Sequence, residues 1–245
     1  MKKIVITGAL GYIGTELCKL YSGFSWKYEV IAIDNRFISE RVNELKRRKI
    51  RFIQADILNL EAIKLFIEEA EIVHHLAGIT DVAYVKKESD KAKDDLTAKV
   101  AIEGTANVLK SMNTEATIVF PSTHVVFEGL KEQKENLDEN EKTNTFLAYS
   151  TSKVENENQI IKSGKNYAIF RLGSVYGFST DTMRMNIMPN LFSKIASQNG
   201  QIKLFGGGVQ LKSLVPLIDV ARCFKFVEEK DNFKNGIYNL SKENV

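Results

Sequence analysis

The chain has 245 residues, of which 44% are hydrophobic and 27% charged, a composition typical of a soluble globular protein with one or two domains. Its net charge of +3 is too small to predict nucleic-acid binding. Cys18 and Cys223 are isolated, so neither a disulfide framework nor a metal site is predicted. Since no apolar run reaches the roughly 18 residues of a membrane helix, and the N-terminus enters a strand without a signal peptide, we predict a cytoplasmic protein with no membrane partner.

The stretch KKIVITGALGYIG at residues 2–14 predicts a buried strand that turns into a helix. Residues 4–6 are β-branched, and Gly8, Gly11 and Gly14 fall three residues apart across the turn. Glycines at these places allow a tight turn, close approach of the backbone to a diphosphate, and close packing of the helix on the strand. The helix N-terminus itself favours a phosphate.

An acidic residue completes the pattern of a dinucleotide site. Asp34 lies 20 residues after Gly14, at the end of a second predicted strand over residues 29–33. A carboxylate there can hold the adenosine ribose hydroxyls of NAD and repel the 2′-phosphate of NADP. We therefore predict NAD as the cofactor, while Arg36 leaves NADP as an alternative.

Strand and helix patterns alternate through most of the chain. This alternation predicts an α/β fold, a Rossmann-type doubly wound parallel sheet whose ligands lie at the carboxyl ends of the strands. The charged residues 128–145 predict a long loop over that edge. The further strands are expected over residues 50–54, 71–76, 116–120 and 167–172, and the helices over 60–70, 89–112 and 149–162.

Beyond residue 177 the alternation loosens, and we expect a smaller substrate-binding lobe over residues 178–245 that lacks a core of its own. The NAD-binding domain is then residues 1–177. The lobe is predicted to contain a helix over 187–197, a strand over 202–205, a glycine turn at 206–208, a strand near 214, a helix from 219 and a strand over 236–240.

Two later strand ends supply further candidates for the cofactor site. Asp56 and Ile57 could flank the adenine, although Asp56 is also placed to cap the next helix. Small residues at Ala77-Gly78 leave room for a cofactor across the fourth strand. The two histidines before them, at 74 and 75, are expected to be strand residues rather than metal ligands, because no third ligand lies nearby.

Tyr149 and Lys153 are four residues apart at the start of a predicted helix, so they share one face of it. A free tyrosine has a pKa of about 10 and is a poor base at neutral pH. A lysine ammonium beside it favours the phenolate. The pair therefore predicts a general acid/base for interconverting an alcohol and a ketone, with Lys153 also holding the nicotinamide ribose.

A hydroxyl at the end of the fifth strand is expected to complete this site. Thr123, with Ser122 as the alternative, could hydrogen-bond the reacting oxygen and orient it toward Tyr149. Both hydroxyls could instead satisfy backbone groups at the strand end. Ser122, Thr123 and His124 do not form a recognisable hydrolase triad.

These motifs together resemble the extended short-chain dehydrogenase/reductase family, and within it the NAD-dependent sugar-nucleotide epimerases and dehydratases. The resemblance covers essentially the whole chain. It rests on GALGYIG at 8–14, Asp34, HLAG at 75–78, GTANVL at 104–109, PST at 121–123, YSTSK at 149–153 and RLGSVYG at 171–177.

The resemblance implies bound NAD and a nucleoside-diphosphate sugar as substrate. The catalytic residues would be Thr123, Tyr149 and Lys153, and Thr123, Asn186 and Lys212 would contact the substrate, the last two at its diphosphate. Lys212 stands where the family usually has arginine, and it keeps the charge but loses the two-pronged grip. The cofactor would be held by Gly8, Gly11, Tyr12, Ile13, Gly14, Asp34, Asn35, Asp56, Ile57, Leu76, Ala77, Gly78, Tyr149 and Lys153.

Departures from the family pattern help to choose the reaction. Dehydratases usually carry Asp-Glu after the catalytic hydroxyl residue, whereas His124-Val125 follows Thr123 here. We therefore predict an epimerase that works through a transient keto intermediate. Two alternatives stay open, a keto-sugar reductase or dehydrogenase whose strand-end motif is similar to residues 122–129, and a non-catalytic NAD(H)-binding regulator.

The resemblance also implies an assembly and a length. Relatives often dimerise through the two helices predicted at residues 89–112 and 149–162, so a homodimer is expected. Relatives usually continue for several dozen residues beyond the strand at which this chain stops. We therefore expect the substrate-binding lobe to be incomplete at its C-terminal end.

Overall fold

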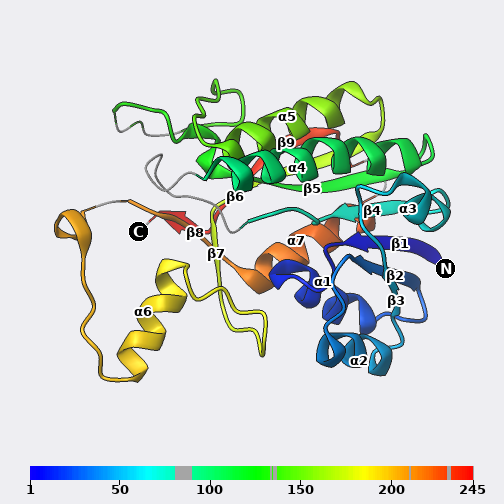
Figure 1. Cartoon of the computed structure of the whole chain (residues 1–245), viewed down its shortest axis with the longest axis horizontal. Helices are drawn as coiled ribbons and strands as arrows, with labels where there is room; N and C mark the ends of the chain where they lie inside the picture. Colours follow the sequence, from blue (N-terminus) through cyan, green and yellow to red (C-terminus); the bar gives the residue numbers. More distant parts are fainter. Residues whose placement is uncertain (81–89, 133, 135–136, 210, 231–232, 245) are drawn as a thin grey trace.

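The computed structural model describes residues 1–245 except 81–89, 133, 135–136, 210, 231–232 and 245 (Figure 1). Its main sheet has seven parallel strands in the order β3-β2-β1-β4-β5-β6-β9. The order reverses between β1 and β4, which places a ligand crevice at the carboxyl ends of the strands. The strands are β1 (Lys2–Thr7), β2 (Tyr28–Asp34), β3 (Arg51–Gln54), β4 (Ile72–His75), β5 (Thr117–Thr123), β6 (Asn166–Leu172) and β9 (Gly236–Leu240).

Helices cover both faces of this sheet (Figure 1). One face carries α1 (Tyr12–Ser22), α2 (Ser39–Arg47) and α7 (Leu217–Glu229). The other carries α3 (Leu60–Ile67), α4 (Lys91–Ser111) and α5 (Ala148–Lys162). The predicted Rossmann-type doubly wound parallel sheet is therefore confirmed.

Alternation along each central strand divides the core into two clusters, one on each face. Ile4 and Ile6 of β1 pack beneath α1 and α7, while Val5 between them packs beneath the opposite helices. All three side chains are completely buried. Burying each one contributes about 1.5–3 kcal/mol, which explains why a β-branched run without polar breaks forms this central strand.

The C-terminal third of the chain contributes to two sheets. Its last long strand, β9, pairs with β6, and α7 buries Val220 and Phe224 in the same cluster as Ile4. A second, three-stranded sheet joins β7 (Ser174–Tyr176), β8 (Ser213–Pro216) and β10 (Glu243–Asn244), and α6 (Met188–Ser197) lies between β7 and β8 in sequence. The functional division at residue 177 stays a prediction.

Some predicted elements differ from the structure. The strand predicted over residues 202–205 is wrong, since residues 201–204 have no regular structure and Phe205–Gly208 form a 3₁₀ turn. Ile202 and Leu204 are 39% and 60% exposed, so their alternation buries no face. Helix α3 ends three residues before the predicted end, and residue 89, where a helix is predicted to begin, lies outside the described residues.

Candidate functional site

The glycine turn after β1 is shaped by close backbone contacts. Gly8 has a φ of +67°, and a Cβ there would lie 2.7 Å from the backbone nitrogen of Ala77 after β4. A Cβ on Gly14 would lie 2.4 Å from the carbonyl oxygen of Gly8. Side chains at either position would push α1 or β4 away from the turn, so both glycines are required for this packing.

The beginning of α1 is suited to an anion. Gly11 is its N-cap, and no side chain in the described part of the chain caps this end. The first backbone N–H groups of a helix lack partners within it and carry a partial positive charge. Together with the two packing glycines, this end fits the diphosphate of NAD. Gly11, Tyr12 and Ile13 all lie at this end of α1, where they are predicted to contact the cofactor.

Asp34 lies where β2 ends, beside this turn, and it is buried. Its Oδ2 accepts the backbone N–H of Leu10 at 3.0 Å. Its Oδ1 accepts the backbone N–H and the Nε of Arg36, both at 3.1 Å. The carboxylate is thus held by the glycine turn and by Arg36, and its contact with the ribose of a cofactor stays a prediction.

The other predicted cofactor residues follow β3 and β4. Asn35 Nδ2 donates to Asp56 Oδ2 at 3.3 Å, so the ends of β2 and β3 are joined at the crevice. The capping alternative for Asp56 is wrong, because Asn59 caps α3 by accepting the N–H of Ala62. Ile57 is buried against Gly104 of α4, and its contact with the adenine stays a prediction.

After β4, the backbone N–H groups of Leu76 and Ala77 both donate to Thr7 at the end of β1. A Cβ on Gly78 would meet no atom within 4 Å, so the chain opens toward the crevice at this residue. Ala77 instead packs closely against Gly8, and the cofactor contacts of both small residues stay a prediction.

The adjacent histidines are structural members of β4. His75 lies with Nδ1 2.8 Å from the Thr7 hydroxyl and Nε2 3.1 Å from the Thr105 hydroxyl. His74 lies with Nε2 2.8 Å from the Tyr21 hydroxyl. Burial lowers the pKa of both rings to about 3, which keeps them neutral. Both are strand residues, as predicted.

Lys153 is held against β5, one helical turn after Tyr149 on α5. Its Nζ donates to the carbonyl oxygen of Pro121 in β5 at 2.7 Å and lies 5.8 Å from the centre of the Tyr149 ring. Burial lowers the pKa of Lys153 to about 8, and the carboxylate of Glu157 opposes that shift. Tyr149 itself is half-buried.

The start of α5, which positions Tyr149, is capped from a distance. Leu147 is the N-cap residue, and its side chain makes no capping bond. Instead Glu128 Oε1 accepts the backbone N–H groups of Phe146 at 3.0 Å and Leu147 at 2.9 Å, and the hydroxyl of Ser150. The segment before α5 thus fixes the helix that carries the acid/base pair, a role that sequence reasoning missed.

The structure distinguishes the two candidate hydroxyls at the end of β5. Ser122 Oγ donates to Glu157 Oε1 at 2.5 Å, and Arg171 of β6 donates to both oxygens of the same carboxylate at 3.1 and 2.8 Å. Among the described residues, Thr123 Oγ1 has one partner, the backbone N–H of Val125, whose long bond of 3.3 Å it accepts. Ser122 is therefore used in the core, and Thr123 is the better candidate for a reacting oxygen.

Sequence reasoning missed Glu157 and Arg171, a buried ion pair whose side chains are each 4% exposed. The sequence could have predicted that Glu157 lies near Lys153, because it comes four residues later and shares its helix face. Arg171 was noticed only inside a family motif. Its pairing depends on β6 and α5 lying together, which local spacing does not specify.

The predicted substrate contacts lie on the same side of the molecule, but they are exposed. Lys212 precedes β8 and lies close enough to His124 for its charge to help lower the pKa of that ring, after burial, the main cause. His124 lies with Nδ1 2.8 Å from the carbonyl oxygen of Leu172. Asn186 is exposed just before α6. Their contact with a diphosphate stays a prediction.

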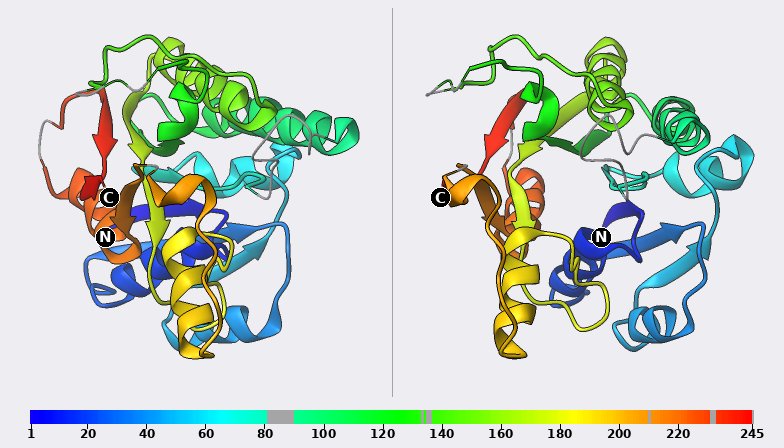
Figure 2. Two further views of the ribbon diagram at one scale, coloured as in Figure 1. Left: turned by 90° about the vertical axis from the view of Figure 1, so that its left-hand side faces the viewer. Right: turned by 60° about the vertical axis from the view of Figure 1, so that its left-hand side comes forward.

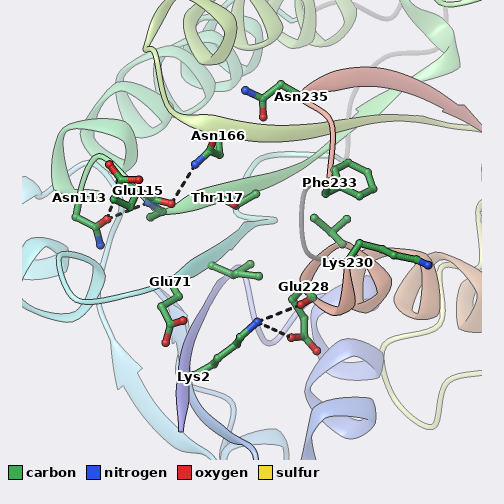
Figure 3. A pocket seen from close by; sticks show the side chains of 13 residues that line it. Lys2, Glu71, Asn113, Glu115, Thr117, Asn166, Glu228, Lys230, Phe233 and Asn235 are labelled. Atoms are coloured by element: carbon green, nitrogen blue, oxygen red, sulfur yellow. Dashed lines mark hydrogen bonds and ion pairs between the residues drawn. The ribbon is translucent and has the colours of Figure 1, made fainter.

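A cavity of about 450 Å³ lies at the opposite, amino end of the sheet. Figure 3 shows Lys2 and Glu228 pointing toward one another across it, and their charged atoms are 3.6 Å apart. Its rim mixes side chains of both charges, such as Glu71 and Lys230. None of the predicted site residues lines it.

Comparisons with known proteins agree with this arrangement. The model of the NAD dependent epimerase/dehydratase family matches residues 4–241. A putative UDP-glucose 4-epimerase of Methanocaldococcus jannaschii is 28% identical over 97% of this chain and 76% of its own length.

Among solved structures, a UDP-glucose 4-epimerase of Thermotoga maritima with UDP-glucose has a TM-score of 0.82 at 23% identity, over 99% of this chain and 78% of that one. A UDP-glucuronic acid 4-epimerase variant of Bacillus cereus, with a fluorinated UDP-sugar and NAD, has a TM-score of 0.83 at 23% identity, over 99% and 79% of the two chains. At these identities the two structures support the fold.

The fold and the crevice define a nucleotide-dependent enzyme of the Rossmann class. The chain belongs to the NAD dependent epimerase/dehydratase family, and its cofactor is NAD. Within the described residues, no helix is both long and apolar enough to cross a membrane, and no group of three potential metal ligands occurs.

Proposed function

We propose that this chain is an epimerase that inverts one carbon of a nucleoside-diphosphate sugar through a transient keto intermediate. The observation that carries this proposal is the placement of Tyr149 and Lys153 on α5 against the end of β5, where Thr123 lies. The residues after Thr123 are His124-Val125, without the acidic pair that an elimination of water would use. The putative UDP-glucose 4-epimerase of Methanocaldococcus jannaschii, which matches 97% of this chain, supports the same reaction.

Each residue has a chemical role in this proposal. Tyr149 accepts the proton of a sugar hydroxyl as that carbon is oxidised, and later returns a proton to the same oxygen. The Lys153 ammonium stabilises the tyrosinate, and the Thr123 hydroxyl hydrogen-bonds the reacting oxygen. Bound NAD supplies the hydride acceptor and then the hydride donor. Inversion requires the sugar to present its other face between the two transfers.

We propose that the substrate diphosphate lies between Lys212 and Asn186, both of which are exposed. Lys212 is exposed and carries a charge near the end of β5, as its effect on His124 indicates. An ammonium provides a point charge rather than a planar fork, so we expect it to bind the diphosphate without fixing its orientation.

A second candidate function is supported by Arg36. A keto-sugar reductase exchanges its cofactor, and some reductases use NADPH. The Arg36 guanidinium lies on the Asp34 carboxylate, with Nε 3.1 Å from Oδ1, and so brings a cation to the place where a 2′-phosphate would lie. A reductase with this site would be purified without bound cofactor.

The deciding experiment denatures the purified protein, identifies the nucleotide that it releases, and then supplies UDP- and dTDP-sugars to fresh protein. We expect stoichiometric NAD and interconversion of a sugar nucleotide with no net absorbance of reduced nicotinamide. An empty site that consumes added NADH or NADPH with a keto-sugar would instead establish the reductase. A protein that binds NAD and turns over neither substrate would favour the regulator.

We also propose a cytoplasmic homodimer. Helices α4 and α5 lie side by side on one face of the sheet, where two copies of the chain could pack (Figure 1). Leu96 of α4 and Ile161 of α5 are exposed by 50% and 42%. Light scattering on the purified chain should give twice the monomer mass, and a monomer would remove this proposal.

A further inference from the structure

Residues 177–187, called the crossing segment, run from β7 to α6 over the first turns of α1 (Figure 2). The hydroxyl of Tyr12 donates to the carbonyl oxygen of Gly177. Thr15 Oγ1 lies 3.1 Å from Thr182 Oγ1. Since α1 begins in the glycine turn, the crossing segment lies against the element that fits the cofactor diphosphate.

Arg41 of α2 fastens the middle of this segment. Its Nε donates to Asp181 Oδ2 at 2.6 Å, and its Nη2 donates to the Asp181 carbonyl oxygen at 2.9 Å. The Arg41 side chain is 17% exposed, which is low for a surface arginine. A guanidinium that donates to a side chain and to the backbone of one residue restricts both, which a simple surface ion pair does not.

The same guanidinium is connected to the ribose end of the cofactor site. Arg41 Nη1 donates to the carbonyl oxygen of Leu10 at 2.7 Å, and the Leu10 N–H donates to Asp34 at 3.0 Å. Leu10 lies within the glycine turn. The Arg41 side chain therefore joins the crossing segment to the glycine turn. Leu10, which it contacts there, also donates to the Asp34 carboxylate that is predicted to hold the ribose.

The other side of the crossing segment is also attached. Arg184 Nη2 donates to the carbonyl oxygen of Thr80, beyond β4, at 3.2 Å. Asn190 Nδ2 donates to the Arg184 carbonyl oxygen at 2.9 Å. The segment is thus fixed to α2 on one side of the crevice and to the chain after β4 on the other. We expect a dinucleotide bound at the glycine turn to lie beside this segment, because Tyr12 and Thr15 of α1 both contact it.

We propose that Arg41 and Asp181 form a clasp that holds the crossing segment over the glycine turn and slows the release of NAD. Both are positioning residues, because they act through the segment and the turn. The inference rests on the proposed function, since an epimerase reuses one NAD and benefits from retaining it, whereas a reductase must exchange its cofactor at every turnover.

The test measures release of NADH from the full chain without any sugar, by mixing NADH-loaded protein with excess NAD and following nicotinamide fluorescence. We expect Asp181→Ala to accelerate release about threefold and Arg41→Ala about tenfold, since Arg41→Ala also removes the bond to Leu10. The double variant should release NADH no faster than Arg41→Ala, because both changes open the same clasp.

Arg47→Ala is the matched control, because Arg47 lies on α2 but is 76% exposed, and its one ion pair within the described residues is with Glu44 of the same helix. Its release rate should equal that of the unmodified chain. Thermal unfolding of each variant without cofactor checks that α2 is intact. If Arg41→Ala does not fold, Asp181→Ala still tests the clasp, because the Asp181 side chain is exposed and its removal should leave the fold unchanged.

Equal release rates in Asp181→Ala and the unmodified chain would overturn the clasp, even if Arg41→Ala released NADH faster. A chain that retains no NADH at all would overturn it as well. Because no sugar is present, these outcomes do not depend on whether the chain is an epimerase. Loss of epimerase activity with an unchanged release rate would therefore count against the clasp and leave the proposed function standing.

Discussion

The two ends of the main sheet are both polar, but they use polarity differently. At the amino end, Glu228 is completely buried and lies within 3.7 Å of three lysines, and Tyr28 donates to it. At the carboxyl end, no side chain of the described residues caps the start of α1, and the Thr123 hydroxyl accepts one long hydrogen bond. A cavity alone therefore does not locate the chemistry of this fold, whereas the direction of the strands and helices does.

The largest expected effect is a loss of kcat when a tyrosine is changed at the carboxyl end of the sheet but not at the amino end. Tyr149→Phe should lower kcat by about 10² to 10⁴-fold, since it removes the proposed acid/base while leaving the ring in place. Tyr238→Phe is the control, because its hydroxyl donates to the Lys234 carbonyl oxygen near the amino end. Steady-state kinetics at saturating sugar nucleotide measure both. Equal activity in the two variants would remove the proposed mechanism.

The second prediction concerns stability at the amino end. Glu228→Gln should lower the free energy of unfolding by about 3 kcal/mol, because the lysines around a buried carboxylate lose their counter-charge. The folded variant should keep its kcat. Urea denaturation measures the loss. Glu44→Gln removes an exposed carboxylate that pairs with Arg47 of α2 and with Arg48, the C-cap residue of that helix. It should lower the free energy of unfolding far less. A Glu228→Gln variant as stable as Glu44→Gln would contradict this account.

This contrast also explains how much the sequence predicted. The parallel sheet followed from alternating periods, because each strand carries its own apolar pattern. The glycine turn and the Tyr149–Lys153 pair were predicted because their members lie within a few residues of one another. The Arg41–Asp181 and Arg171–Glu157 contacts were not, since each joins two segments whose packing against one another is not specified by local spacing.

The wrong strand at 202–205 has the same origin. Alternating apolar residues there resemble a strand, but a strand also needs a partner with which to pair, and the spacing of Ile202 and Leu204 does not supply one. The β7 strand was overlooked for the opposite reason. It is only three residues long, and β8 pairs with it from about forty residues further along the chain.

The third prediction separates the two hydroxyls at the end of β5. Thr123→Ala should lower kcat by about 10²-fold, since it removes the hydroxyl that we propose donates to the reacting oxygen. Ser122→Ala should leave kcat much closer to normal and instead lower stability by about 1 kcal/mol, because Glu157 loses one hydrogen bond. Kinetics and denaturation of both variants provide the measurement. Reversed effects would make Ser122 the reacting hydroxyl.

The fourth prediction tests the turn itself. Gly14→Ala should lower stability by about 1–3 kcal/mol and weaken NAD binding, because its Cβ would lie 2.4 Å from the Gly8 oxygen. Gly23→Ala at the other end of α1 is the matched control, as its Cβ would lie 3.5 Å from the Leu20 oxygen, an ordinary contact distance. Thermal unfolding and NAD titration measure both. If Gly14→Ala bound NAD normally, α1 would not have to approach the turn so closely.

The smallest predicted effect is a fall in catalytic rate at high pH, which we attribute to Lys153 at the carboxyl end of the sheet alone. Burial lowers the pKa of Lys153 from 10.5 to about 8, so its ammonium is charged below pH 8 and progressively lost above it. The rate at pH 9 should therefore be about tenfold lower than at pH 7, because only a charged Lys153 stabilises the tyrosinate. Glu157→Gln should move the fall in rate to lower pH, because the Glu157 carboxylate raises the pKa of Lys153 and its removal lets burial lower that pKa further. Lys225→Met, a change to a buried lysine at the amino end, should leave the profile where it is. A rate that stays level to pH 10 in the unmodified chain would mean that the charge of Lys153 does not support catalysis.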